Sequence, residues 1–511
     1  MNTVSFLAIP AGIVPDQDAV VFDDRRFTYA DTLARVRRLA GALHALGVDR
    51  GTRVAALHTN THRYVEAYYA TAMLGGVFIP VNYRAKRPEL EHMLRASQAR
   101  VLFVGERYLE HVDALRAGLG DLRHVVGFDF AADAGAYEDL LAAAPEHEEE
   151  ADVEDAETSI LMFTSGTTSL PKGVMLTYGD FTAYVTANVE LADGTPRGAA
   201  LLCAPLYHIA GATNMMTTLW TGRRLVVMPQ FEPGDWLALV ERERITHAFV
   251  VPTMMKHLLD HPDFASRDLS SLEVLSYGGA PMPFPVIRRA IERFPSSVGF
   301  VNAFGQTETT STLTILGPDD HRLQGSAEEV ERRTRRLRSI GRPLPDVEVR
   351  IRGDDGATLT PGDVGEIEVR TPRVMKGYAG AKDSALTPDG WLPTRDLGWI
   401  DEDGYLYVAG RKDDMIIRGG ENIAPAEVES VVQAHPAVEE VAVVGVPDVE
   451  WGQRVAAFVV LRPGATTTAD ELGEFCRQRL SSFKKPEVIQ FLDELPKNPM
   501  GKILRRELRV S

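Results

Sequence analysis

A run of small hydroxyl-bearing residues that leads to a lysine has the composition of a phosphate-binding loop. It reads Thr164-Ser165-Gly166-Thr167-Thr168-Ser169, followed by Leu170-Pro171-Lys172. Hydroxyls, backbone N–H groups and one ammonium can together surround a phosphate. The common P-loop is excluded, because Gly173 stands where that motif has Ser or Thr. A plain turn in a β-hairpin is the other interpretation.

Two glycine-containing motifs further along the chain could complete such a site. Ser276-Tyr-Gly-Gly-Ala-Pro281 follows the apolar run Leu272–Leu275, and Asn302-Ala-Phe-Gly-Gln-Thr-Glu308 follows a second strand-like segment. Glycines let another group approach the backbone closely, and a carboxylate such as that of Glu308 suits Mg2+. Taken alone, the first motif is only a turn and Glu308 is only an exposed acid.

Short apolar runs on both sides of the loop, Ile160–Phe163 and Val174–Leu176, predict the strands that hold it. Before them, predicted strands alternate with predicted helices, one of which begins at Thr28 and Asp31 with the spacing of a capping box. This alternation predicts an α/β fold of layered, largely parallel sheets. The predicted strands are Arg53–His58, Gly76–Val81 and Val101–Val104, and the predicted helices are Arg63–Leu74 and Arg87–Ser97.

The pattern changes after Arg342, where short strands separated by Gly-Asp turns predict a small β-rich subdomain. We place a domain boundary at Gly410-Arg-Lys-Asp-Asp414 and divide the chain into domains 1–412 and 413–511. The second domain is predicted to be α+β and to fold on its own. Its predicted helices are Ala426–Ala434 and Ala469–Leu480, and its predicted strands are Val438–Val446 and Val455–Leu461.

Composition excludes several classes of protein. With 511 residues, of which 44% are hydrophobic, the chain reads as globular with more than one domain, and no apolar run approaches the roughly 18–20 residues of a membrane span. A net charge of −17 argues against nucleic-acid binding, so a polyanionic ligand needs individually placed cations. The N-terminus has no basic leader, and the only cysteines are Cys203 and Cys476. Both observations favour a cytoplasmic location.

A basic run lies between residues 331 and 338, with five arginines among eight residues. A solvated helix face is the favoured interpretation, because charge runs usually have that role. A contact with a CoA phosphate or with an anionic membrane surface is the alternative.

The loop Thr164–Gly173 and the two later motifs, in this order, resemble the adenylate-forming superfamily. This superfamily includes acyl-CoA synthetases, aryl-CoA ligases, nonribosomal adenylation domains and beetle luciferases. The resemblance extends from about residue 30 to the C-terminus, and Ser169 stands where the family usually has Gly. It implies ATP, Mg2+ and CoA as ligands, and a small C-terminal domain that is mobile.

The resemblance also implies a role for each motif. Residues 279–281 are implied to line one face of the adenine and Phe304 the other, while Thr307 contacts the α-phosphate. Glu308 is implied to bind Mg2+, with Thr164 near it. The implied ATP- and AMP-binding residues are Thr164, Ser165, Gly166, Thr167, Thr168, Lys172, Gly279, Ala280, Pro281, Asn302, Phe304, Gly305, Gln306, Thr307, Asp396, Arg411 and Lys502.

His208, in Pro205-Leu-Tyr-His208, is implied to gate the pocket for the substrate carboxylate, although a lone His beside apolar residues is more often packed in a core. An acyl pocket is expected from residues 208–213, 250–254 and 305–312. Those residues are mostly apolar or small, so a hydrocarbon or aromatic acid fits better than an amino acid.

The C-terminal part carries the remaining implied residues. Asp396, in Trp391-Leu-Pro-Thr-Arg-Asp396, is implied to bind the ribose, and Arg395 replaces the Gly that the family more often has. Asp413 matches the hinge position and Gly420 the path of the pantetheine arm. Lys502, otherwise an ordinary surface lysine, is implied to bridge the carboxylate and the α-phosphate. The implied catalytic residues are Lys502, His208 and Thr307.

The sequence therefore predicts an acyl-CoA synthetase that activates a small carboxylic acid, fatty or otherwise hydrophobic, through an acyl-adenylate. One alternative is a fatty acyl-AMP ligase that loads an acyl carrier protein. A catalytically impaired acyl- or nucleotide-binding relative is a second alternative, and the sequence neither supports nor excludes a luciferase-like oxidation.

Overall fold

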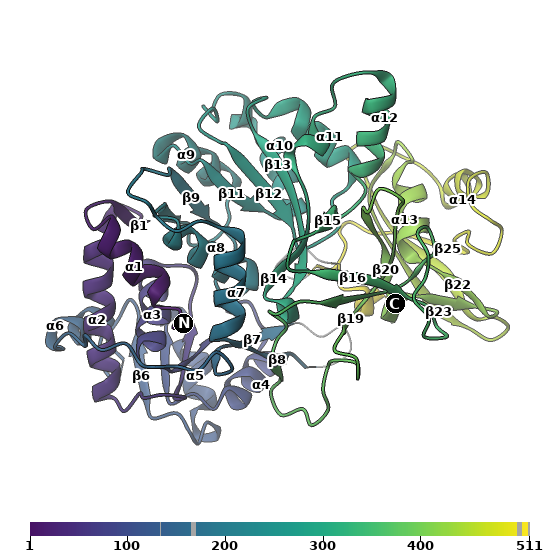
Figure 1. Ribbon diagram of the computed structural model, residues 1–511. Helices are drawn as coiled ribbons and strands as arrows, with labels where there is room; N and C mark the ends of the chain where they lie inside the picture. The colour runs from purple at the N-terminus through teal and green to yellow at the C-terminus, as the bar shows by residue number, and fades with distance from the viewer. Residues whose placement is uncertain (133, 165–169, 498–502, 509–511) are drawn as a thin grey trace. The chain divides into compact units, whose positions relative to one another are not determined.

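The computed structural model describes residues 1–132, 134–164, 170–497 and 503–508. Within it the chain divides into two compact units (Figure 1). Unit 1 comprises residues 1–337, 343–347 and 371–385, and unit 2 comprises residues 338–342, 348–370 and 386–511. The boundary between residues 412 and 413 falls inside unit 2 and stays a prediction.

Unit 1 is built on mostly parallel sheets, as the sequence predicts. One sheet has the order β14-β13-β12-β11-β9-β10-β1-β2, and the other has the order β18-β8-β7-β4-β3-β5-β6. The first consists of β1 (Asp18–Phe22), β2 (Arg25–Thr28), β9 (Ala199–Leu202), β10 (Arg224–Val227), β11 (His247–Val250), β12 (Val274–Gly278), β13 (Gly299–Gln306) and β14 (Ser311–Leu316). The second consists of β3 (Arg53–Leu57), β4 (Val77–Pro80), β5 (Val101–Val104), β6 (His124–Gly127), β7 (Thr158–Thr164), β8 (Lys172–Thr177) and β18 (Gly377–Tyr378).

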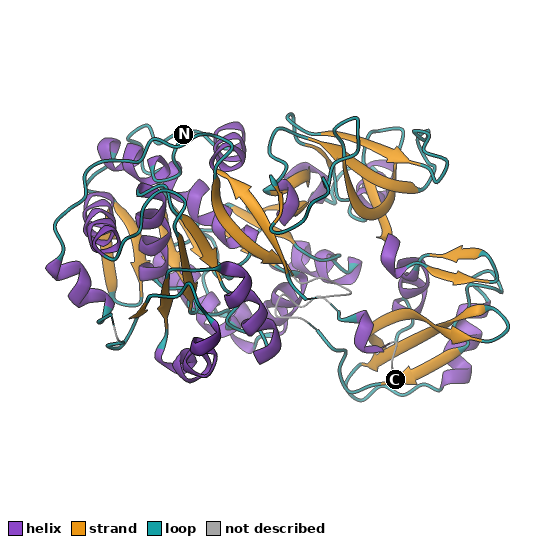
Figure 2. Ribbon diagram, turned by 90° about the horizontal axis from the view of Figure 1, so that it is seen from below, coloured by secondary structure: helices purple, strands orange, loops and turns teal. Residues whose placement is uncertain are grey.

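Successive residues of a strand point to opposite faces of the sheet. Because the residues on both faces of these strands are apolar, helices cover both faces of each sheet. On β10, Leu225 packs into the core that contains α1, α2, α3, α7 and α8, whereas Val226 packs against α9, α10 and α11. On β3, Val54 faces the first of these cores and Ala55 faces α4 and α5. One layer of helices therefore lies between the sheets, and the others lie outside them (Figures 1 and 2).

Capping boxes begin several helices of unit 1, including the one that the sequence predicts. Thr28 and Asp31 form the predicted capping box at the start of α2, and Thr177 and Asp180 form another at α7. The bounds are α1 (Ser5–Ile13), α2 (Tyr29–Ala45), α3 (His62–Met73), α4 (Arg87–Ser97), α5 (Leu109–Leu115), α6 (Tyr137–Ala143), α7 (Tyr178–Asn188), α8 (Ile209–Trp220), α9 (Pro233–Glu243), α10 (Pro252–Asp260), α11 (Phe284–Arg293) and α12 (Ala327–Arg336).

The basic run of the sequence forms most of α12, and none of the residues of this helix is buried. Arg333 donates to the backbone oxygen of Arg322 at 2.9 Å, and Arg336 donates to Asp320 at 3.2 Å. These contacts fit the predicted solvated helix face. Among the residues that the structure describes, no helix has both the length and the apolar character needed to cross a membrane.

Unit 2 contains a four-stranded antiparallel sheet, the predicted β-rich subdomain, and a smaller α+β part. In the latter, Val443 and Val455 pack against α13 and α14, while Val444 and Ala456 face α15 on the other side of the sheet. The four-stranded sheet has the order β16 (Glu348–Arg352), β17 (Gly365–Arg370), β19 (Leu392–Ile400) and β20 (Leu406–Arg411). The other elements are β21 (Ile416–Arg418), β22 (Glu421–Ile423), α13 (Pro425–Gln433), β23 (Val438–Asp448), β24 (Gly452–Leu461), α14 (Ala469–Arg477), β25 (Val488–Phe491) and α15 (Arg505–Leu508). The short strand β15 (Arg342–Pro343) lies where the chain passes from one unit to the other.

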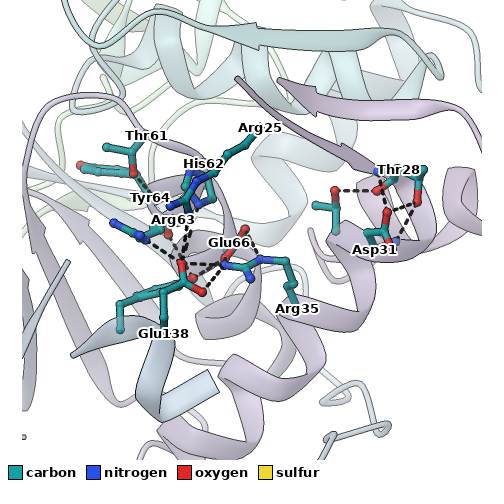
Figure 3. A network of polar contacts seen from close by, with 12 residues as sticks. Arg25, Thr28, Asp31, Arg35, Thr61, His62, Arg63, Tyr64, Glu66 and Glu138 are labelled. Carbon is teal, nitrogen blue, oxygen red and sulfur yellow. Dashed lines mark hydrogen bonds and ion pairs between the residues drawn. The ribbon is translucent and has the colours of Figure 1, made fainter. Parts of the chain in front are cut away.

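A buried ion-pair network ties α2, α3 and α6 together in unit 1 (Figure 3). Arg35 donates to both oxygens of Glu66, at 2.8 and 3.0 Å, and the Tyr137 hydroxyl donates to Glu66 at 2.6 Å. Arg35 and Arg63 also donate to Glu138. The neighbouring ring of His62, together with these guanidinium groups, holds the pKa of the Glu138 carboxyl well below its usual range.

Replacing Arg35 by Ala tests this network. Glu66 is only 1% exposed, so the substitution leaves a buried carboxylate without its cation and should lower the free energy of unfolding by about 3 kcal/mol. Arg38 provides the control, because it lies on the same helix but pairs with Glu146 at the surface, where Arg38→Ala should cost less than about 1 kcal/mol. Urea unfolding followed by circular dichroism measures both, and equal losses would contradict the assignment.

Candidate active site

The hairpin of β7 and β8 carries the predicted phosphate loop. Thr164 at the end of β7 pairs with Lys172 at the start of β8, and its hydroxyl donates to the Lys172 carbonyl oxygen at 3.5 Å. Lys172 is exposed and therefore open to a ligand. Ser165, Gly166, Thr167 and Thr168 lie outside the described residues, so their contacts with phosphate stay predictions.

Tyr378 of β18 connects the lysine of this hairpin with Glu308. The Lys172 ammonium lies 5.1 Å from the centre of the Tyr378 ring, a cation–π distance, and the Tyr378 hydroxyl donates to Glu308 at 2.9 Å. One side chain thus contacts both the cation expected to bind phosphate and the carboxylate expected to bind Mg2+. Sequence reasoning missed Tyr378, because no motif marks it and its pairing with Val174 of β8 joins distant parts of the chain.

The predicted walls of the adenine pocket lie directly after β12 and within β13, two neighbouring parallel strands in which Gly278 pairs with Ala303. Residues 302–306 lie within β13 and not after a strand as expected, because they also pair with β14. A Cβ atom on Gly278 would lie 2.1 Å from the Ala303 carbonyl oxygen, so only glycine fits there. Gly279 follows with a φ of +77°, which glycine adopts without strain.

Groups near the ends of these strands are polar or accessible to a ligand. Gln306 has a buried side-chain nitrogen that lacks a hydrogen-bond partner among the described residues. A buried donor of this kind is costly unless something accepts its hydrogen bond, and a nucleotide could do so. The residues expected to contact adenine are not buried, namely Gly279, Ala280, Pro281 and Phe304.

A strained turn follows β13 and positions Thr307 and Glu308. Thr310 has a φ of +49° and Ser311 a φ of +84°, in the region that side chains disfavour. Arg373, which is fully buried, holds this turn: it donates to the Thr309 carbonyl at 3.0 Å, and its own carbonyl accepts a hydrogen bond from Thr310. Strain that is held in this way is typical of functional sites. The sequence contained no signal for Arg373.

His208 caps the N-terminus of α8, where its Nδ1 accepts a hydrogen bond from the backbone of Ala210 at 3.5 Å. Burial lowers the pKa of His208 to about 4, so the imidazole is neutral at neutral pH. Further along α8, the Thr213 hydroxyl donates to Ser311 of β14 at 3.2 Å. This contact connects the helix that begins at His208 with the strained turn.

Two of the predicted site residues of unit 2 contact each other. Asp396 pairs in register with Arg411 across β19 and β20, and their side chains form an ion pair at 2.9 Å. Gly420 lies in the turn between β21 and β22 with a φ of +89° and open space around its Cα atom. Lys502 lies outside the described residues, so its role stays a prediction.

Family models match most of the chain. One, described as an AMP-binding enzyme, matches residues 11–379, and another, the AMP-binding enzyme C-terminal domain, matches residues 427–502. The chain belongs to the AMP-binding enzyme family. The first match contains the hairpin, the paired strands and the strained turn, and the second ends at Lys502.

Relatives of this AMP-binding enzyme align over nearly its whole length. A feruloyl-CoA synthase of Amycolatopsis sp is 38% identical over 98% of this chain and 96% of its own. The fatty acid–acyl-carrier-protein ligase ScoC of Streptomyces coeruleorubidus is 34% identical over 97% of this chain and 93% of its own. The solved structure of o-succinylbenzoate CoA synthetase from Bacillus subtilis, in complex with the acyl-adenylate OSB-AMP, has a TM-score of 0.84 and 32% identity, covering 99% of this chain and 98% of that one.

These findings place the enzyme in the adenylate-forming superfamily, as an AMP-forming acid–thiol ligase of the acyl-CoA synthetase type. It forms an acyl-CoA by way of an acyl-adenylate and uses ATP and CoA as co-substrates.

Mg2+, the ion typical of this family, fits the residues present. The half-buried Glu308 offers a carboxylate, and Mg2+ prefers one or two carboxylates together with phosphate oxygens and water. Among the described residues, no group of three or more His, Cys, Asp or Glu side chains could hold a metal by itself. The donor set therefore suits an ion shared with the phosphates of a nucleotide, where it would neutralise their charge.

The pKa of His208 makes a testable contribution to stability. The folded state binds no proton at His208 until the pH approaches 4, whereas the unfolded chain binds one near pH 6.5, so acidification favours unfolding. Between pH 7 and pH 5, this proton uptake should lower the free energy of unfolding of the wild type by on the order of 1–2 kcal/mol. His208→Asn keeps a capping side chain but has no imidazole to titrate, so it should not show this part of the loss. Urea unfolding at both values measures this difference. His44, whose side chain is 58% exposed, supplies the control substitution His44→Asn, and equal behaviour of the two variants would argue against the assignment.

Proposed function

We propose that the acid activated by this enzyme is hydrophobic, either a fatty acid or an aromatic acid. The observation that carries the proposal is the scarcity of charge in residues 208–213, 250–254 and 305–312. Glu308 is the one acidic or basic side chain in these segments besides the neutral His208, and its carboxylate already accepts a hydrogen bond from Tyr378. An amino acid substrate would need an anionic partner for its ammonium group.

The named activities of the relatives support the same substrate class. Ferulic acid and o-succinylbenzoate are aromatic acids, and ScoC is named for a fatty acid. ScoC also favours a second candidate function, in which an acyl carrier protein replaces CoA as the acceptor.

In the proposed reaction, the substrate carboxylate attacks the α-phosphorus of ATP and displaces pyrophosphate. Lys172, Thr307 and the loop that contains Thr164 bind the phosphates, and Lys502 stabilises the charge that develops during the attack. Asp396 and Arg411 bind the ribose. The thiol of CoA then attacks the acyl carbon and AMP departs, without a covalent intermediate on the protein.

A cytoplasmic location belongs to the same proposal. Cys203 and Cys476 are both free and buried, which suits a reducing compartment.

A panel of carboxylic acids tests the substrate and the acceptor together. Pyrophosphate release is measured with fatty acids, hydroxycinnamic acids and amino acids, with and without CoA or a holo-carrier protein, and the products are identified by mass. We expect acyl-CoA from fatty or aromatic acids and none from amino acids. Thioester that forms only on the carrier protein would establish the second candidate, and activity with amino acids alone would overturn the proposed substrate class.

Lys502→Ala tests the division of labour between the two half-reactions. Loss of the ammonium should reduce acyl-adenylate formation at least about a hundredfold, because an electrostatic contact to the transition state is removed, whereas thiolation of supplied acyl-adenylate should change little. Pyrophosphate exchange and single-turnover thioester formation measure these steps separately. Lys484 pairs with Glu427 at 2.8 Å, and Lys484→Ala is the control that should retain both. Equal loss of both half-reactions in the Lys502 variant would contradict this assignment.

A further inference from the structure

The backbone of unit 2 is strained at Arg395, one residue before Asp396. Arg395 has a φ of +63°, in the left-handed region that glycine adopts freely and other residues disfavour. The side chain at this position is 60% exposed, so burial of apolar surface does not explain why a bulky residue is tolerated. The polar contacts of the side chain are the remaining source of compensation for the strain.

The guanidinium of Arg395 makes a two-bond contact with Asp413. Nε donates to one carboxylate oxygen at 2.9 Å, and Nη2 donates to the other. Two parallel hydrogen bonds between an arginine and a carboxylate fix both position and orientation. Asp413 lies in the short turn Lys412–Asp414, directly after β20.

Asp413 is the last of three consecutive residues that are tied to the four-stranded sheet. Arg411 pairs with Asp396 of β19 at 2.9 Å, and Lys412 pairs with Glu366 of β17 at 2.7 Å. The next residue, Asp414, changes partner: it pairs at 3.8 Å with Arg505 of α15, which also pairs with Glu429 of α13. The chain therefore passes from one set of partners to another between residues 413 and 414, beside the predicted domain boundary.

We propose that Arg395 is a positioning residue that latches Asp413 to β19, and that this latch sets the balance between acyl-adenylate formation and thiolation. The inference rests on the proposed function, in which the two half-reactions make different demands on unit 2. Because both partners contact solvent, the pair is weak, and a weak pair opens and closes readily during turnover. The strain at Arg395 lowers the cost of opening further, since release of the side chain lets the backbone relax.

A purely structural ion pair makes a different prediction. If Arg395 only stabilised the fold, its loss would lower both half-reactions together or neither. A latch instead shifts a population between two arrangements, so that one half-reaction gains what the other loses. The ratio of the two rates therefore separates the two roles.

Arg395→Gly is the decisive variant, because glycine accepts the positive φ and preserves the backbone while removing the latch. We expect the ratio of pyrophosphate exchange to single-turnover thioester formation to change about fivefold, with the two rates moving in opposite directions. Asp413→Asn should change the ratio in the same sense, and the double variant should add little, because both substitutions break one contact. Arg395→Lys, which lacks the two-bond geometry, should fall between the wild type and Arg395→Gly.

Arg370→Ala is the matched control. Arg370 forms an exposed ion pair with Glu348 in the same four-stranded sheet, and none of its ion pairs in the described part of the chain involves residues 411–413. This variant should leave the ratio unchanged. A ratio unchanged in Arg395→Gly, or an equal fall of both rates, would overturn the proposal.

Hydrogen exchange measured by mass spectrometry gives a readout that does not depend on the acceptor. Backbone amides in residues 405–418 should exchange faster in Arg395→Gly than in the wild type or in Arg370→Ala, because the latch no longer holds the turn. Unchanged exchange would overturn the latch itself. If the wild type forms no thioester with CoA, the proposed function fails, whereas faster exchange in the variant would still establish the latch.

Discussion

A chain with a net charge of −17 that uses ATP must place each cation near the phosphates by a specific contact. In unit 1, Tyr378 makes that contact: its ring lies against the Lys172 ammonium, and its hydroxyl holds Glu308. The cation and the anion of the site thereby contact the same side chain, and the described part of the chain shows no ion pair between them. Each remains available to the ligand of opposite charge, phosphate for the lysine and a metal ion for the carboxylate.

Backbone geometry is the second constraint on the site, and it acts through close approaches and strain. Gly278 allows β12 and β13 to approach where a side chain would collide with a carbonyl oxygen. Thr310 and Ser311 adopt unfavourable φ angles that the buried Arg373 holds in place. Contacts within the protein thus hold the turn that carries Thr307 and Glu308, which reduces the entropy lost when a ligand is ordered.

Unit 2 uses charge differently. The pair of Arg411 with Asp396 has a buried carboxylate, whereas the pair of Arg395 with Asp413 is partly exposed to water. Exposed pairs contribute little to stability, so their geometry is easily exchanged for another. Rigid contacts in unit 1 and the weak pair of Arg395 with Asp413 in unit 2 are consistent with an enzyme that holds one nucleotide while it carries out two successive reactions.

The sequence by itself determined the elements and the motifs, because both depend on neighbouring residues. The helix Arg87–Ser97, the capping box at Thr28 and the strands around the phosphate loop follow from local periodicity and local hydrogen bonds. Tertiary structure alone decided the contacts of Tyr378, Arg373 and Arg395. Their partners lie far away along the chain, and Arg395, with its positive φ, meets Asp413 only in the folded structure.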